Sequence, residues 1–253
     1  MSFTTFSPRR WLAAALLALP LLASAQQLTV SAAASLTDAF KEIGQKFDAV
    51  HPGVNVRFNF AASGVLIQQI VQGAPVDVFA SADQATMDRG IEQKAIDAGT
   101  RRDFAANTVV LIVPAQGGLA LTSLADLNSA AVKRIAIGKT ATVPVGRYTQ
   151  QVLESAKLWS LLEPRFIQAD SVRQVLDYVA RGEVEAGFVY RTDAALMADK
   201  VKVVLTADGH TPVRYPVAVV ADSKHKALAS EFTAFLFTPA AQDVLARFGF
   251  GKP

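Results

Sequence analysis

The sequence of 253 residues contains no cysteine. This absence excludes disulfide bonds, cysteine-ligated zinc or iron–sulfur centres, and thiol catalysis. A lipid-anchored exported protein needs a cysteine at the start of its mature chain. We therefore expect a protein without a lipid anchor.

Histidine is also scarce, since the chain holds only His51, His210 and His225. A hydrolytic triad needs a nucleophile, a base and an acid that orients the base. No Gly-x-Ser-x-Gly elbow surrounds either Ser35 or Ser63. An exported hydrolase is therefore disfavoured, and we expect no catalytic residues and no enzyme.

Net charge is low, with 25 basic and 22 acidic residues and a formal charge of +3. Residues 1–25 contain two arginines and no acidic residue, so the remainder carries about +1 by this count. Nucleic-acid binding depends on clustered Lys and Arg, and no long basic run follows residue 25. We expect no nucleic-acid partner.

The first 25 residues have the layout of a secretory signal peptide. Arg9 and Arg10 precede an apolar run at 11–22, and Ala23-Ser24-Ala25 has the small-x-small pattern of a cleavage site. The run is shorter than the roughly 20 apolar residues that span a bilayer, which disfavours the alternative of an N-terminal membrane anchor. We predict a signal peptide at 1–25 and a soluble periplasmic protein.

The remaining chain alternates β-branched runs with amphipathic stretches. This alternation is typical of α/β proteins with mostly parallel sheets flanked by helices. Strands are predicted at 28–31, 54–60, 76–80, 133–137, 165–168 and 186–190, and helices at 36–47, 65–71, 84–92, 147–157 and 172–181.

Two sets of alternating elements in a chain of this length indicate two lobes of about 100 residues each. We predict lobe 1 at 26–106 and 222–253, and lobe 2 at 107–221. Apolar strands at 108–113 and 217–220 are interpreted as two crossings that form a hinge beside a cleft. A final helix at 226–248 is expected to pack on lobe 1.

Ligands of open α/β sheets bind beyond the carboxyl ends of the strands. The loops there lie at 32–35, 61–64, 143–146 and 170–172, and each precedes a helix N-terminus. Three of them have short or absent side chains at most positions, so the backbone can approach a ligand closely. Each N-terminus carries about half a positive charge and exposes unpaired N–H groups, which suits an oxyanion. Taken singly, however, Ser35 and Ser63 are more simply explained as helix N-caps, and Tyr190 as a half-buried packing residue.

The motifs at these loops resemble the periplasmic molybdate-binding proteins of ABC transporters. They occur in that family's order and cover essentially the whole mature chain. The matching segments are Val30-Ser31-Ala32-Ala33-Ala34-Ser35-Leu36-Thr37-Asp38-Ala39, Phe60-Ala61-Ala62-Ser63, 73–84, 143–148, 170–173, Gly187-Phe188-Val189-Tyr190 and Tyr215-Pro216-Val217-Ala218-Val219-Val220.

The resemblance implies a type II periplasmic binding protein fold and a site of neutral donors. Ser35 and Ser63 would each supply a hydroxyl and a backbone N–H, Val145 and Val172 backbone N–H groups, and Tyr190 its phenol. The family leads us to expect a residue smaller than Val145, so this side chain would narrow the pocket. Molybdenum would be present only within bound molybdate, with no protein ligand to the metal and no cofactor. The implied partner is a membrane permease, and a monomer is expected.

Charged residues near these loops are given other roles. Asp77 and Asp83 are interpreted as capping and loop residues. Arg147 and Arg173 lie in first helical turns, where side chains point away from the N-terminal donors, so we predict rim or lobe–lobe contacts.

Ligand chemistry separates molybdate from its neighbours. Molybdate, tungstate and sulfate are dianions that only accept hydrogen bonds, whereas phosphate keeps a proton and needs an acceptor. Only Asp170 among the matched positions is a candidate acceptor, which disfavours phosphate. Sulfate, the alternative ligand, must be distinguished from molybdate by its size. Tungstate and molybdate are too similar in size to be distinguished in this way.

Two other binding classes fit less well. The effector domain of a transcription regulator would carry a DNA-binding helix pair in place of a signal peptide. A site for an amino acid needs a pair of charges, and a metal site needs clustered His, Tyr or carboxylates. Neither set occurs at the matched loops.

Overall fold

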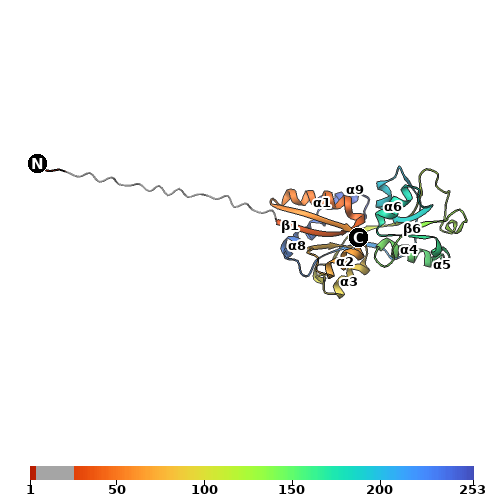
Figure 1. The fold of residues 1–253 in the computed structure, drawn as a ribbon, viewed down its shortest axis with the longest axis horizontal. Coiled ribbons are helices and arrows are strands. Elements are labelled where there is room, and N and C mark those ends of the chain that lie inside the picture. The colour runs from red at the N-terminus through yellow and green to blue at the C-terminus, as the bar shows by residue number, and fades with distance from the viewer. Residues whose placement is uncertain (4–25) are drawn as a thin grey trace.

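The computed structural model describes residues 1–3 and 26–253. Most of the predicted signal peptide, 1–25, therefore lies outside the described residues. Residues 26–253 form two lobes, each with helices on both faces of a five-stranded sheet (Figure 1). Among the helices described, none combines the length and apolar character needed to cross a membrane.

The sheet of lobe 1 has the strand order β2-β1-β3-β10-β4. Four of its strands are parallel, and β10 runs antiparallel to its neighbours β3 and β4. Helices α1 and α9 pack together, as do α2 and α3, and Figure 1 shows the pairs on opposite sides of the strands. The elements are β1 (Gln26–Ala33), α1 (Thr37–Val50), β2 (Val54–Ala61), α2 (Ser63–Val71), β3 (Val78–Ala80), α3 (Gln84–Glu92), β4 (Arg102–Asn107), β10 (Val213–Val219), α8 (Lys226–Phe235) and α9 (Pro239–Arg247).

The sheet of lobe 2 has the order β7-β6-β8-β5-β9. Again four strands are parallel, and the single antiparallel strand, β5, enters directly from the other lobe. The predicted fold class, two lobes with mostly parallel sheets, is confirmed. The elements are β5 (Val109–Pro114), β6 (Ile135–Gly138), α4 (Pro144–Ser155), α5 (Trp159–Leu162), β7 (Phe166–Ala169), α6 (Val172–Ala180), β8 (Ala186–Tyr190), α7 (Arg191–Leu196) and β9 (Val201–Thr206).

The chain crosses between the sheets twice, between β4 and β5 and between β9 and β10. The second crossing therefore lies at 207–212. The predicted crossing at 217–220 and the lobe 2 boundary at 221 are wrong, because β10 is hydrogen-bonded to β3 and β4 within the first sheet. An apolar strand read alone does not reveal which sheet it joins.

The predicted helix at 226–248 is two helices, α8 and α9. Thr238 accepts the backbone N–H of Ala241 as the N-cap of α9, and Pro239 occupies the first helical position. Proline is favoured there because its missing N–H is not needed. Both helices still belong to lobe 1, since α8 contacts β10 and α9 contacts α1.

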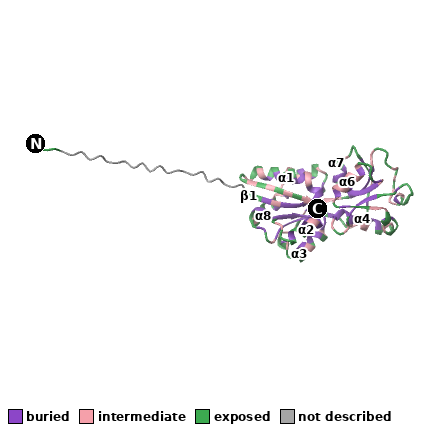
Figure 2. Cartoon of the chain, viewed as in Figure 1, coloured by how far each residue is buried: buried purple, intermediate pink, exposed green. Residues whose placement is uncertain are grey.

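The apolar core fills the space between each sheet and its helices (Figure 2). In lobe 1 it centres on rings from α1, β4 and α8: Phe40, Phe47, Phe104 and Phe232 are fully buried. Each such ring contributes about 1.5–3 kcal/mol when removed from water. Two well-packed lobes linked by two short crossings make the crossings the natural place for motion.

Candidate functional site

A small cavity lies between the lobes. All five residues predicted for the oxyanion site line it, from both lobes. The lining is Ala33, Ala34, Ser35, Ala62, Ser63, Ala82, Val143, Pro144, Val145, Val172 and Tyr190.

Four helical N-termini meet at this cavity, as the strand order of the two sheets requires. Ser35 lies in the 3-10 turn (Ala34–Leu36) that leads into α1, and Ser63 is the first residue of α2. Val145 is the second residue of α4, and Val172 is the first of α6. First-turn N–H groups have no acceptor within their helix. Within the described residues, the N–H groups of Ser63, Val145 and Val172 donate to no other backbone or side-chain group.

The lining contains no ionisable residue except Tyr190. Burial raises the pKa of Tyr190 well above its ordinary value, so its phenol stays protonated and neutral. Four helix N-termini of about +0.5 charge each supply roughly two units of positive potential. The cavity therefore has the electrostatics of a dianion site built without a cationic side chain.

Neither serine caps its helix, so the simpler explanation of Ser35 and Ser63 as N-caps is wrong. The N-cap positions fall on Ala33 and Ala62, whose side chains cannot accept a hydrogen bond. The hydroxyl of Ser63 instead accepts the backbone N–H of Ala82 at 3.1 Å. Accepting this bond leaves the hydroxyl proton of Ser63 free to be donated.

Tyr190 ends β8 and is only 1% exposed. Its ring packs edge-on against Tyr148 and Tyr215, with centroids 6.4 and 5.9 Å away. Its hydroxyl donates to the carbonyl of Ala82 in lobe 1 at 3.5 Å, a distance at the limit of a hydrogen bond. A phenol held this loosely can redirect its proton to a ligand.

Glycine at position 146 holds α4 close to β6. A Cβ atom there would lie 2.0 Å from the carbonyl oxygen of Gly138, the last residue of β6. Only glycine allows this approach, which fixes the N-terminus of α4 and hence the N–H of Val145. In the sequence, Gly146 is recognisable only as part of the loop at 143–146.

Arg147 and Arg173 connect the lobes, as predicted. Nε of Arg147 donates to Oδ2 of Asp83 at 2.8 Å, and its Nη2 donates to Oγ1 of Thr86 at 2.7 Å. Arg173 donates to Oδ2 of Asp38 in lobe 1 at 2.9 Å and to Oδ1 of Asp193 in its own lobe at 2.6 Å. Both guanidinium groups are thus engaged by carboxylates outside the cavity lining.

Asp193 is fully buried, whereas the side chain of its partner Arg173 is 27% exposed. Burial raises the pKa of Asp193 to about 6, although the guanidinium of Arg173 acts to lower it. Burial also opposes the charge of Arg173, but the carboxylates of Asp193 and Asp38 outweigh it and raise the pKa of Arg173. The second carboxyl oxygen of Asp193 has no partner among the described residues.

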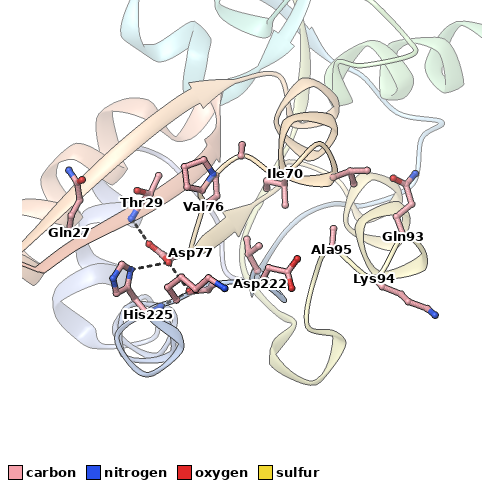
Figure 3. Close-up of a pocket in the computed structure, with 17 residues that line it drawn as sticks. Gln27, Thr29, Ile70, Val76, Asp77, Gln93, Lys94, Ala95, Asp222 and His225 are labelled. Carbon is pink, nitrogen blue, oxygen red and sulfur yellow. Dashed lines mark hydrogen bonds and ion pairs between the residues drawn. The ribbon is translucent and has the colours of Figure 1, made fainter.

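The two aspartates interpreted as structural have that role. Asp83 is the N-cap of α3, accepting the N–H of Thr86. Asp77 lies in a second cavity, on lobe 1 (Figure 3), where its carboxylate accepts from the N–H of Thr29 at 2.8 Å and the hydroxyl of Ser223 at 2.7 Å. His225 also approaches it, at 3.3 Å. The described residues contain no cluster of His, Cys, Asp or Glu that fits a metal ion.

Two lobes joined by two crossings, with convergent donors in a cavity between them, define a two-lobed solute-binding protein. The chain belongs to the family described as bacterial extracellular solute-binding protein, whose model matches residues 28–251.

Three known proteins illustrate its relationships. The chain is 38% identical to the molybdate-binding protein ModA of Escherichia coli over 90% of each chain. It is 37% identical to the putative ABC transporter substrate-binding lipoprotein YvgL of Bacillus subtilis, over 88% of this chain and 85% of the relative. The solved periplasmic molybdate-binding protein of Azotobacter vinelandii superposes with a TM-score of 0.77 at 25% identity, covering 89% of this chain and 99% of that one.

Proposed function

We propose that this protein binds molybdate, and also tungstate, and delivers it to the membrane permease of an ABC transporter. The observation that carries the proposal is the cavity, which offers hydrogen-bond donors from both lobes and no charged side chain. The names of the relatives support the same ligand.

The donors divide between the lobes. Ser35 and Ser63 each offer a hydroxyl and a backbone N–H from lobe 1. Val145 and Val172 offer backbone N–H groups from lobe 2, and Tyr190 offers its phenol. An anion held by both sets bridges the cleft and favours the closed form. No protein atom would ligate the metal directly, and no cofactor is required.

Selectivity follows from the protonation and size of the oxyanion. Asp170, the one candidate acceptor for a protonated anion, forms an ion pair with Lys139 and its side chain is 73% exposed. It is not part of the cavity lining. Phosphate, which keeps a proton, is therefore disfavoured. Sulfate is smaller than molybdate, so donors set for the larger anion would be left overstretched at about 1–3 kcal/mol each.

The cellular setting is part of the proposal. Residues 1–25 would direct export and be removed, leaving a soluble, monomeric periplasmic protein without a lipid anchor. The protein would act as a carrier and not as an enzyme. Its functional partner would be the permease, to which the closed form presents both lobes.

A calorimetric competition titration of the mature chain tests the ligand. We expect molybdate and tungstate to bind at one site per chain, with sulfate and phosphate much weaker. Sulfate binding as tightly as molybdate would reassign the protein as a sulfate carrier. Absence of oxyanion binding altogether would refute the proposed function.

A further inference from the structure

The hydroxyl of Ser35 has a buried partner behind it. Its Oγ lies 3.0 Å from Oη of Tyr215, a fully buried residue of β10, and by distance alone either atom can donate. The direction matters, because a Ser35 hydroxyl that donates its proton to Tyr215 turns a lone pair toward the cavity. Such a lone pair would repel an oxyanion.

Asn107, at the first crossing between the lobes, resolves this direction. The backbone N–H of Thr108 can only donate, and it lies 2.9 Å from Oδ1 of Asn107. The other amide atom is therefore the NH₂ group. It donates to Oη of Tyr215 at 3.2 Å and to Oγ1 of Thr192 at 2.9 Å.

The hydroxyl proton of Tyr215 then has only one favourable direction. Its oxygen accepts from Asn107, so its own proton must go to Ser35 or remain unpaired in the interior, which is costly. Burial raises the pKa of Tyr215 well above its ordinary value, so the proton is retained. The hydroxyl of Ser35, having accepted from Tyr215, keeps its own proton for the cavity.

We infer that Asn107 and Tyr215 are positioning residues that make Ser35 a hydrogen-bond donor toward the cavity and thereby favour fully deprotonated oxyanions over protonated ones. The inference rests on the proposed function. Ser63 is held in the same way by the backbone N–H of Ala82. Both serines therefore present protons, and one of the two lone pairs of each oxygen is already used, so the O–H of a protonated anion meets a poorer acceptor in either.

The substitution Asn107→Asp reverses the chain of donors at nearly constant shape. A carboxylate at 107 accepts the proton of Tyr215, Tyr215 then accepts from Ser35, and Ser35 faces the anion with a lone pair. We expect molybdate affinity to fall about tenfold or more, the effect of losing a hydrogen bond to a charged group. Thr192→Val is the matched control, because it removes only the other partner of the same amide, and it should leave affinity within about twofold.

Repulsion by the new carboxylate also weakens anion binding, and a double-mutant cycle separates the two causes. With Tyr215→Phe in place, Ser35 is free to donate whatever stands at 107. The double variant Asn107→Asp/Tyr215→Phe should therefore bind molybdate more tightly than Asn107→Asp alone. Equal affinities of these two variants would overturn the inference.

Tyr215→Phe alone provides a second readout that does not depend on how well the Asp variant folds. Freed from its partner, Ser35 can also accept, so the ratio of molybdate to hydrogen phosphate affinity should fall by calorimetry near neutral pH. An unchanged ratio would overturn the inference while leaving the proposed function intact. Failure of the wild-type chain to bind molybdate would instead refute the proposed function.

Discussion

Adding one methyl group at Gly64 should oppose closure of the lobes without damaging either of them. Gly64 is the second residue of α2, and its N–H donates to the carbonyl of Thr142 in lobe 2 at 2.9 Å. A Cβ atom at position 64 would lie 2.6 Å from that carbonyl oxygen and 2.7 Å from Cα of Thr142. Within lobe 1, alanine is the better helix former, by up to about 1 kcal/mol.

The cost of Gly64→Ala falls on the closed form alone. Overpacking costs about 1–3 kcal/mol, and the atoms of Thr142 that the methyl group meets are mostly backbone, which cannot rotate away. Affinity measured for a ligand that binds the closed form decreases by the same free energy. At 1.4 kcal/mol for each factor of ten, molybdate should bind about 5- to 150-fold more weakly. The ligand-free protein should unfold at an unchanged or slightly higher temperature.

Titration calorimetry and small-angle X-ray scattering test this prediction together. Molybdate should reduce the radius of gyration of the wild-type protein but reduce that of Gly64→Ala less. Gly99→Ala is the control, since its Cβ would meet only the carboxylate of Asp97 in its own loop, at 3.4 Å. If Gly64→Ala bound molybdate like the wild type and contracted equally, the contact with Thr142 would not belong to the liganded state.

Three further substitutions probe the lobe contacts and the site. Arg147→Gln breaks the pair with buried Asp83 and should weaken molybdate binding by about 1–3 kcal/mol in calorimetry. The control Arg134→Gln, whose carboxylate partner is in its own lobe, should leave binding unchanged. Ser63→Ala should weaken binding by about 1–3 kcal/mol, and unchanged affinity would remove Ser63 from the site. The pKa of Asp193 is raised from 3.8 to about 6, so the folded state holds this proton more tightly than the unfolded state does. The resulting stabilisation is complete below pH 3.8 and is lost as the pH rises through 6. Between pH 4 and 7, the free energy of unfolding of the wild type in urea should fall by up to about 3 kcal/mol relative to that of Asp193→Asn, at 1.36 kcal/mol per pKa unit. Parallel pH profiles of the two proteins would contradict this.

The location of the cavity could be predicted from the sequence because it depends on local signals. Each donor loop follows a short strand and precedes a helix, and the carboxyl ends of parallel strands meet at one edge. The role of the two serines was harder to predict from the sequence. Whether Ser35 caps a helix depends on a 3-10 turn that begins one residue earlier, at Ala34. Cap preferences alone cannot detect that shift.

Non-local pairing explains the larger errors. Strand β10 joins lobe 1 because its partners are β3 and β4, and nothing in its apolar sequence distinguishes the two sheets. The roles of Tyr215 and Asn107 were missed for the same reason, since their hydrogen bonds join residues distant in sequence. A usable signal existed for Tyr215, because a buried tyrosine ordinarily needs a partner for its hydroxyl.

The contacts of this protein separate into two groups with different consequences for selectivity. Gly64 and Arg147 act on the free energy of closure, which every ligand that bridges the lobes must share. Their substitution should therefore weaken all oxyanions by a similar factor and leave the ratios unchanged. Tyr215 and Asn107 act on the proton that Ser35 presents, so their substitution should change the ratio between deprotonated and protonated anions. Specificity is a difference of affinities, and of these two groups only the second changes it.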